Sequence, residues 1–143
     1  MADLVVDVVQ QHGVDPAEVA VIAPFRAQVR QLRSAIQQRG LRGSEAITVE
    51  TVERIQGQER EVVIVSLTAG DPDATSTRSA FHLSVNRLNV ALSRARTKAV
   101  LVASWHAFRA LPHEAEAMRM ASLCKGLRDR IPVVDLTRVY VAS

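Results

Sequence analysis

Short apolar runs alternate with segments of helical periodicity along this chain. The longest apolar runs cover residues 19–23, 62–67 and 99–103. Continuous apolar strands of this length are typical of a parallel sheet whose two faces are both covered. A shorter run at 47–49 predicts one more strand, and residues 131–134 predict a last short strand.

Helical periodicity places apolar residues on one face in four segments, at 2–12, 26–38, 86–96 and 114–124. A single helical turn is predicted at 52–56, and the Gly, Pro, Asp, Thr and Ser residues of 69–79 predict a surface loop. Because helices alternate with strands, the pattern predicts an α/β fold. In such folds ligands bind at the carboxyl ends of the strands.

Composition supports one folded domain, because 48% of the 143 residues are hydrophobic. Only 3% of the residues are aromatic. The single cysteine, Cys124, excludes an intramolecular disulfide, and no Cys or His pair has the spacing of metal ligands. No apolar run approaches the roughly 20 residues that span a membrane. No signal peptide is predicted either, so the expected location is the cytoplasm.

The charged residues are unevenly distributed, although the net charge is only +3. Arg supplies all the basic residues except Lys98 and Lys125, and no acid occurs in the segments 25–44 and 74–113. Two basic blocks of this kind indicate an anionic partner such as a nucleic acid. The alternative is a solvated basic surface without a specific ligand.

Three segments beside the predicted strands carry candidate chemistry. They read Ala-Pro-Phe-Arg-Ala-Gln at 23–28, Thr-Val-Glu-Thr-Val-Glu-Arg-Ile-Gln-Gly-Gln-Glu at 48–59, and Asn-Arg-Leu-Asn-Val-Ala-Leu-Ser-Arg-Ala-Arg at 86–96. In these segments the chain resembles the superfamily 1 helicases, in the branch of the up-frameshift (RNA-surveillance) helicase, matching motifs IV, V and VI in order. The resemblance spans about residues 19–104, and the third segment is its most specific part.

This resemblance implies a RecA-like, P-loop NTPase-type fold, a three-layer sandwich with a mostly parallel sheet. It also implies that residues 1–143 form a single carboxyl-terminal RecA-like domain of a longer helicase or translocase. The implied partners are an amino-terminal RecA-like domain of the same polypeptide and single-stranded DNA or RNA. The implied cofactors are ATP and Mg²⁺, both held mainly by that other domain.

Two parts of an ATPase are absent from the sequence. It has no GxxxxGK[ST] phosphate loop, and it has no Asp-Glu pair after an apolar strand to hold Mg²⁺. Asp135 does follow a short apolar run, but no Glu follows it. The family carries these parts on the preceding domain. We therefore expect this chain to be a fragment that does not hydrolyse ATP by itself.

The resemblance makes Arg94 the arginine finger of motif VI. Arg is always charged and its planar fork matches phosphate oxygens, and such a finger is worth ~10³–10⁵ in rate. Family members carry a second Arg directly after the motif IV Gln, where this chain has Val29. Arg26, three residues earlier, is the expected replacement at the γ-phosphate, and Arg30 is the alternative.

Further residues are expected near the nucleotide. Glu59 resembles the family carboxylate that accepts a hydrogen bond from the nucleotide sugar, a role that fits because a triphosphate would repel it. Gly57 allows either a sharp turn or a close approach to a ligand. Gln28 and Arg87 complete the expected nucleotide-binding set.

The nucleic-acid contacts are expected at Thr51, Gln56 and Arg96. Thr51 resembles a position that touches the nucleic-acid backbone, and hydroxyl groups are common phosphate ligands. The alternative for Thr51 and Gln56 is ordinary turn polarity, and Arg96 is equally suited to a neighbouring carboxylate or to ATP. Trp105, after the last strong strand, suits base stacking or the core.

Other functional classes fit the sequence less well. A non-catalytic RecA-like module that binds nucleic acid or protein would also suit the basic blocks and the missing phosphate loop. A nuclease or phosphatase would need clustered carboxylates or a nucleophile with its base, and the sequence shows no such cluster.

Overall fold

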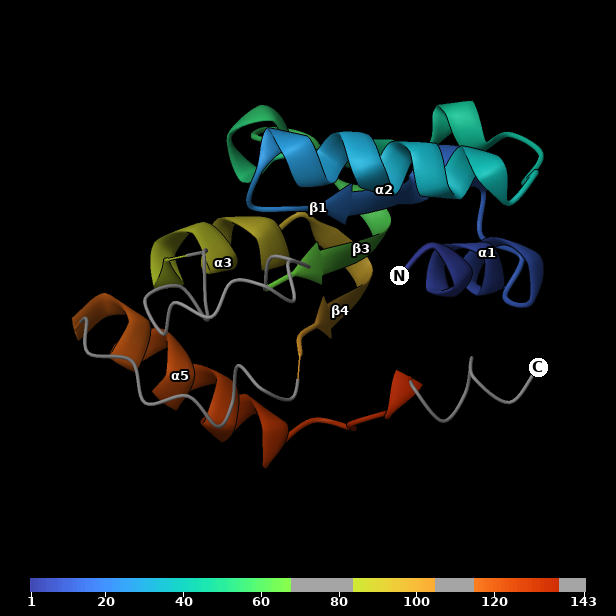
Figure 1. The fold of residues 1–143 in the computed structure, drawn as a ribbon. Helices are drawn as coiled ribbons and strands as arrows, with labels where there is room; N and C mark the ends of the chain where they lie inside the picture. The colour runs from blue at the N-terminus through green and yellow to red at the C-terminus, as the bar shows by residue number, and fades with distance from the viewer. Residues whose placement is uncertain (68–83, 105–114, 137–143) are drawn as a thin grey trace.

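A computed structural model describes residues 1–67, 84–104 and 115–136 of the chain. Within them four parallel strands form one sheet in the order β2-β1-β3-β4 (Figure 1). The strands are β1 Val19–Ile22, β2 Thr48–Glu50, β3 Arg60–Ser66 and β4 Ala95–Val102. The predicted α/β class with a parallel sheet is therefore confirmed.

One face of the sheet is covered by two helices, α1 Ala2–Gln10 and α2 Arg26–Gln38. Side chains alternate between the faces of a strand, so Val19 and Val21 of β1 point to this side with Val62 and Ile64 of β3. They pack against apolar side chains of the two helices, among them Val5, Val8, Val29 and Ile36.

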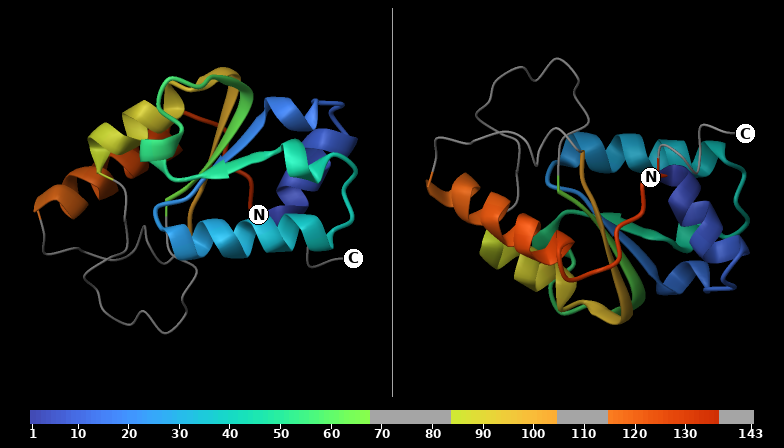
Figure 2. Two further views of the ribbon diagram at one scale, coloured as in Figure 1. Left: turned by 90° about the horizontal axis from the view of Figure 1, so that it is seen from above. Right: turned by 90° about the horizontal axis from the view of Figure 1, so that it is seen from below.

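The opposite face is covered by the short 3-10 helix η3 Val52–Arg54 and by the helices α3 Val85–Leu92 and α5 Ala115–Arg128. Here Ile22, Val63 and Val65 pack with side chains of these elements, such as Ile55, Leu88, Ala91 and Met120. Figure 2 shows the helices on the two sides of the twisted sheet. The predicted three-layer sandwich is confirmed.

Two smaller 3-10 helices complete the described fold, η1 Pro16–Glu18 before β1 and η2 Ser44–Ala46 before β2. No helix of the described residues is long and apolar enough to cross a membrane. The predicted loop 69–79 and Trp105 lie outside the residues that the structure describes.

Several predicted elements differ from those of the structure. The helix predicted at 2–12 ends at Gln10. The helix predicted at 86–96 ends at Leu92, because Ala95 already pairs with Arg60 in the sheet. The helix predicted at 114–124 continues to Arg128. Residues 131–134 form no strand; they follow α5 with exposed side chains, and their β propensity alone does not provide a pairing partner.

Candidate nucleotide and nucleic-acid interfaces

The residues singled out in the sequence divide between the two ends of the sheet. At the carboxyl end, Arg26 begins α2 just after β1, and Thr51 follows β2 directly. The amide Nε2 of Gln28 donates a hydrogen bond of 3.0 Å to Oγ of Ser66, the last residue of β3. This bond fixes the first turn of α2 at the carboxyl end of the sheet.

Arg87 reaches the same end from the opposite layer. It lies in the first turn of α3, whose N-cap Ser84 accepts a hydrogen bond from the Arg87 backbone N–H at 3.3 Å. The Arg87 guanidinium forms an ion pair of 3.0 Å with the carboxylate of Glu53 in η3. Motifs V and VI are therefore in direct contact here.

Glu53 sits among cations at this end. A hydrogen bond from its own backbone lowers the pKa of its carboxyl most, and the Thr51 hydroxyl and the charges of Arg87 and Arg26 lower it further. The carboxylate is therefore ionised at neutral pH, and Arg26, Thr51 and Arg87 all lie around it. Together they form a polar, net basic carboxyl-end cluster.

The amino end of the sheet holds the other two main candidates, Arg94 and Glu59. Arg94 follows the last turn of α3, and its carbonyl oxygen accepts a hydrogen bond of 2.9 Å from the backbone N–H of Arg60, the first residue of β3. Glu59 directly precedes Arg60. The structure thus brings the backbone segments that carry Arg94 and Glu59 next to each other.

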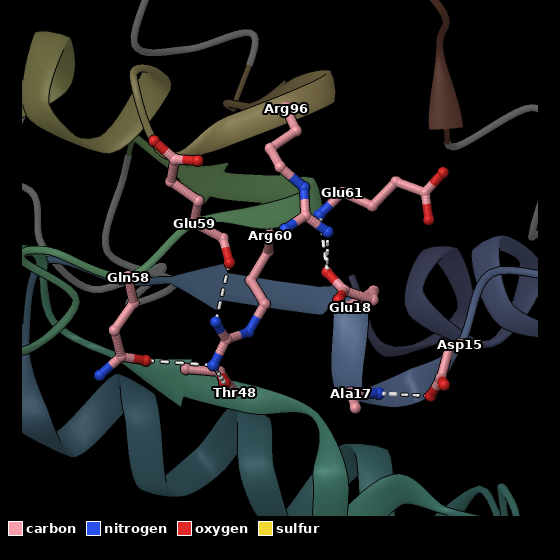
Figure 3. A network of polar contacts seen from close by, with 9 residues as sticks. All are labelled: Asp15, Ala17, Glu18, Thr48, Gln58, Glu59, Arg60, Glu61 and Arg96. Carbon is pink, nitrogen blue, oxygen red and sulfur yellow. Dashed lines mark hydrogen bonds and ion pairs between the residues drawn. The ribbon is translucent and has the colours of Figure 1, made fainter.

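The charged groups of this pair are available to a ligand. Within the described residues the Arg94 guanidinium bonds only to the Val90 carbonyl at 3.3 Å and to Oγ of Ser93 at 3.1 Å, and neither it nor Glu59 has an ion-pair partner there. Figure 3 shows the Glu59 carboxylate pointing away from the side chain of Arg60.

Arg26 and Arg94 are not brought together. Arg26 lies at the level of Ser66, and Arg94 lies beside Arg60, six residues earlier on the same extended strand. At ~3.3 Å per residue these two levels of β3 are about 20 Å apart along the strand. Arg94 itself lies beyond the end of α3, which stops at Leu92.

One departure from the family motifs is explained by burial. Val29, at the position of the usual motif IV arginine, is only 6% exposed and packs in the core under α2. Ile55 of motif V is fully buried against the opposite face. Arg26 and Arg30 are both exposed, so either can meet a ligand.

Gly57 and Gln56 form the exposed turn between η3 and β3. Gly57 has φ of +78°, a conformation that favours glycine, and a Cβ there would meet nothing within 4 Å. Gly57 was expected either to make a sharp turn or to let a ligand approach closely. The described residues show the sharp turn. Gln56 is exposed in this turn, between the two ends of the sheet.

Arg96 lies at the amino end, away from Thr51, and its Nη2 is 2.6 Å from the carboxylate of Glu18 (Figure 3). Of the ligands considered for Arg96, the structure shows the neighbouring carboxylate, that of Glu18. Sequence reasoning missed Glu18, because these two residues are 78 positions apart and no local pattern relates them.

Arg60 is part of the same network. Its Nη1 donates to the Glu59 carbonyl at 2.8 Å, and its Nη2 donates to Oγ1 of Thr48 at 3.2 Å and to Oε1 of Gln58 at 3.1 Å. These bonds fix the segment that leads into β3. Within the described residues no group of three or more His, Cys, Asp or Glu side chains could hold a metal ion.

Comparisons with known proteins agree with this architecture. A family model described as "AAA domain" matches residues 1–106. The chain is 34% identical to "Putative helicase mov-10-B.1" of Danio rerio over 62% of its length, and 30% identical to "Putative helicase MOV-10" of Gallus gallus over 80%. It is 30% identical over 70% of its length to "DNA replication ATP-dependent helicase/nuclease DNA2" of Mus musculus. The matches cover 10%, 15% and 9% of these proteins, so the chain spans a small part of their length.

Proposed function

This chain belongs to the AAA-domain family that forms the carboxyl-terminal region of superfamily 1 helicases, and from this membership we propose that it is the second motor domain of an ATP-dependent DNA or RNA helicase or translocase. It works with a preceding RecA-like domain that carries the phosphate loop. ATP binds between the two domains, and closing of that cleft moves a single strand across both.

The proximity of Arg94 and Glu59 at the amino end of the sheet carries this proposal. The Arg94 guanidinium, which has no acidic partner among the described residues, suits the charge that develops on the γ-phosphate during phosphoryl transfer. The carboxylate of Glu59, on the neighbouring segment of backbone, suits a ribose hydroxyl, a neutral donor. We assign these two residues to the nucleotide, with the Gly57 turn shaping the backbone that leads to Glu59.

The carboxyl-end cluster is assigned to the single strand. Arg26 and Arg87 offer two cations at one end of the sheet, next to Thr51, which is 8% exposed and whose hydroxyl bonds to the Glu53 carboxylate. Cationic side chains of this kind bind sugar–phosphate backbones without reading sequence. Gln28 lies beside them through its bond to Ser66. The assignment of Arg26, Gln28 and Arg87 therefore moves from the nucleotide to the strand, while Gln56 lies on the turn between the two interfaces.

Mg²⁺ is assigned to the preceding domain, because the described residues of this one offer no cluster of carboxylates. The ion, when bound there with ATP, neutralises charge on the phosphate oxygens. The contribution of this chain is the positive charge of Arg94 and the orientation of the sugar by Glu59.

The test is ATP turnover by this chain joined to a phosphate-loop domain, with and without single-stranded DNA or RNA. Arg94→Ala is expected to lower the stimulated rate by about 10³-fold while ATP still binds. Arg42→Ala, which removes an exposed arginine with no ion pair among the described residues, is the matched control. Normal turnover by Arg94→Ala would refute the assignment, and absence of turnover in the joined wild-type protein would favour the non-catalytic binding module.

A further inference from the structure

One carboxylate links three strands at the amino end of the sheet. Glu18 directly precedes β1, and its Oε2 lies 2.6 Å from Nη2 of Arg96 in β4. The same oxygen accepts a hydrogen bond of 3.3 Å from the backbone N–H of Glu61 in β3. Figure 3 shows both contacts converging on Glu18.

These contacts lie next to the pair that faces the nucleotide. Glu61 is two residues after Glu59, and Arg96 is two residues after Arg94. The backbone between β3 and β4 is also linked at this level by the bond from the Arg60 N–H to the Arg94 carbonyl, at 2.9 Å. A displacement of Glu61 or Arg96 would therefore change how Glu59 and Arg94 are presented.

An irregularity in the sheet lies at the same place. Arg60 pairs with Ala95 and Val62 pairs with Lys98, so β3 advances by two residues where β4 advances by three. An extra residue of this kind bends a strand and redirects the side chains around it. Glu18 binds one residue on each strand inside this irregularity: Glu61, which is the single residue on β3, and Arg96, which is one of two on β4.

Glu18 is itself held in place without help from a ligand. It ends η1, where its N–H donates to the Asp15 carbonyl at 2.8 Å and the Asp15 carboxylate caps the N–H of Ala17 at 2.9 Å. Pro16 of the same turn packs against Gly43, where a Cβ would lie 3.1 Å from Cγ of the proline. The bond from Arg96, followed by its charge, keeps the pKa of the Glu18 carboxyl below its ordinary value, so Glu18 is an anion.

We propose that Glu18 is a positioning residue for the nucleotide interface: through Arg96 and Glu61 it fixes the irregular start of β4, so that Arg94 is presented beside Glu59. This inference rests on the proposed function of Arg94. In this proposal Glu18 does not contact the nucleotide itself, because its carboxylate is already bound by Arg96 and by the backbone N–H of Glu61.

The first test uses the 143-residue chain and needs no ATPase. In ¹⁵N-labelled protein, Glu18→Ala is expected to shift the backbone amide signals of Arg94 and Glu59 while the fold and the signals of α2 are kept. Glu61→Gln is the matched control, since it alters a carboxylate at the same end but keeps the backbone N–H that Glu18 binds. Unchanged Arg94 and Glu59 signals in a folded Glu18→Ala variant would overturn the proposal.

The second test uses the chain joined to a phosphate-loop domain. Glu18→Ala is expected to lower kcat about tenfold with little change in the KM for ATP, because misplacing a catalytic group costs rate rather than binding. The charge reversal Glu18→Arg with Arg96→Glu is expected to restore much of this loss. A decrease that the reversal does not restore, accompanied by a lower Tm, would indicate a purely structural role and overturn the proposal.

Arg94→Ala separates the two proposals in this assay. Loss of turnover in Arg94→Ala with normal kcat in Glu18→Ala would overturn the positioning role and leave the proposed function standing. Normal turnover in Arg94→Ala would instead remove the proposed function, and the kinetic role of Glu18 with it.

Discussion

The guanidinium of Arg87 lies 3.0 Å from the carboxylate of Glu53, and this contact joins the first turn of α3 to η3. Both side chains are 55% exposed, and exposed ion pairs of this kind stabilise proteins little. Its consequence lies in binding, since Glu53 competes with a nucleic-acid phosphate for the cations around it. Glu53→Gln is therefore expected to tighten binding of a single-stranded oligonucleotide about threefold at low salt.

Fluorescence anisotropy of a labelled oligonucleotide, titrated with this chain at several salt concentrations, measures that effect. Arg87→Ala should weaken binding and reduce the slope of log K against log salt by about 1. Glu45→Gln, an exposed carboxylate in η2, is the control and should leave binding unchanged. Weaker binding by Glu53→Gln would contradict the assignment of this end to the strand.

Two glycine substitutions should change stability in opposite directions. Gly57 has φ of +78°, so Gly57→Ala forces an L-residue into a left-handed conformation and should cost about 1 kcal/mol of unfolding free energy. Gly126 lies inside α5 with nothing within 4 Å of a Cβ, so Gly126→Ala should add about 0.5–1 kcal/mol. Urea unfolding of the two variants measures both; a gain from Gly57→Ala would contradict the turn geometry.

Restoring the family arginine at position 29 should destabilise this domain. Val29 is 6% exposed in the core under α2, so Val29→Arg places an unpaired charge there and should cost about 3 kcal/mol or more. Ala27→Arg adds the same side chain to an exposed position of the same helix and should be nearly neutral. Equal denaturant midpoints for the two variants would show that position 29 can expose a charge.

The ion pair between Asp3 of α1 and Arg39 at the end of α2, 2.7 Å long, should make stability sensitive to acid. The hydrogen bond from Arg39 keeps the pKa of the Asp3 carboxyl below its ordinary value. A carboxyl with a lowered folded pKa contributes stability above its unfolded pKa of about 3.9, and that contribution is lost as pH falls through the folded pKa.

Thermal unfolding at several pH values tests this link between α1 and α2. Arg39→Gln should lower Tm at pH 7, and its difference from wild type should shrink as pH falls below about 4. Arg30→Gln, an exposed arginine of α2 without an acidic partner among the described residues, should follow wild type throughout. A difference in Tm between Arg39→Gln and wild type that stayed constant down to pH 2 would contradict a stabilising ion pair between Asp3 and Arg39.

Much of the fold could be predicted from local pattern. The bounds of α2, 26–38, coincide with the prediction because its apolar stripe, Val29 and Ile36, faces the core, and all four predicted core strands lie in the sheet. The end of α3 could not be predicted, since Ala95 and Arg96 are good helix formers by local propensity. Pairing with β3 places them in a strand instead, and no local window contains that information.

The candidate site, like the fold, could be predicted from the sequence only in part. The motifs identified Arg94 and Glu59, whose backbone segments are adjacent, but the sequence could not reveal that Arg87, at the start of α3, and Arg94, beyond its end, lie at opposite ends of the sheet. That separation follows from where the helix stops. Glu18 has no motif at all, and only the folded chain brings it to Arg96 across 78 positions.

The place of β4 at the margin of the sheet also affects how this domain behaves in concentrated solution. Within the described residues β4 has no neighbouring strand on its outer side, and such an edge can pair with another chain and start aggregation. Its exposed stretch carries Arg96 and Lys98, and only its carboxyl half is apolar and partly covered. Arg96 is paired with Glu18, whereas the ammonium groups of Lys98 on two adjacent copies would repel each other, so Lys98 discourages pairing along this edge.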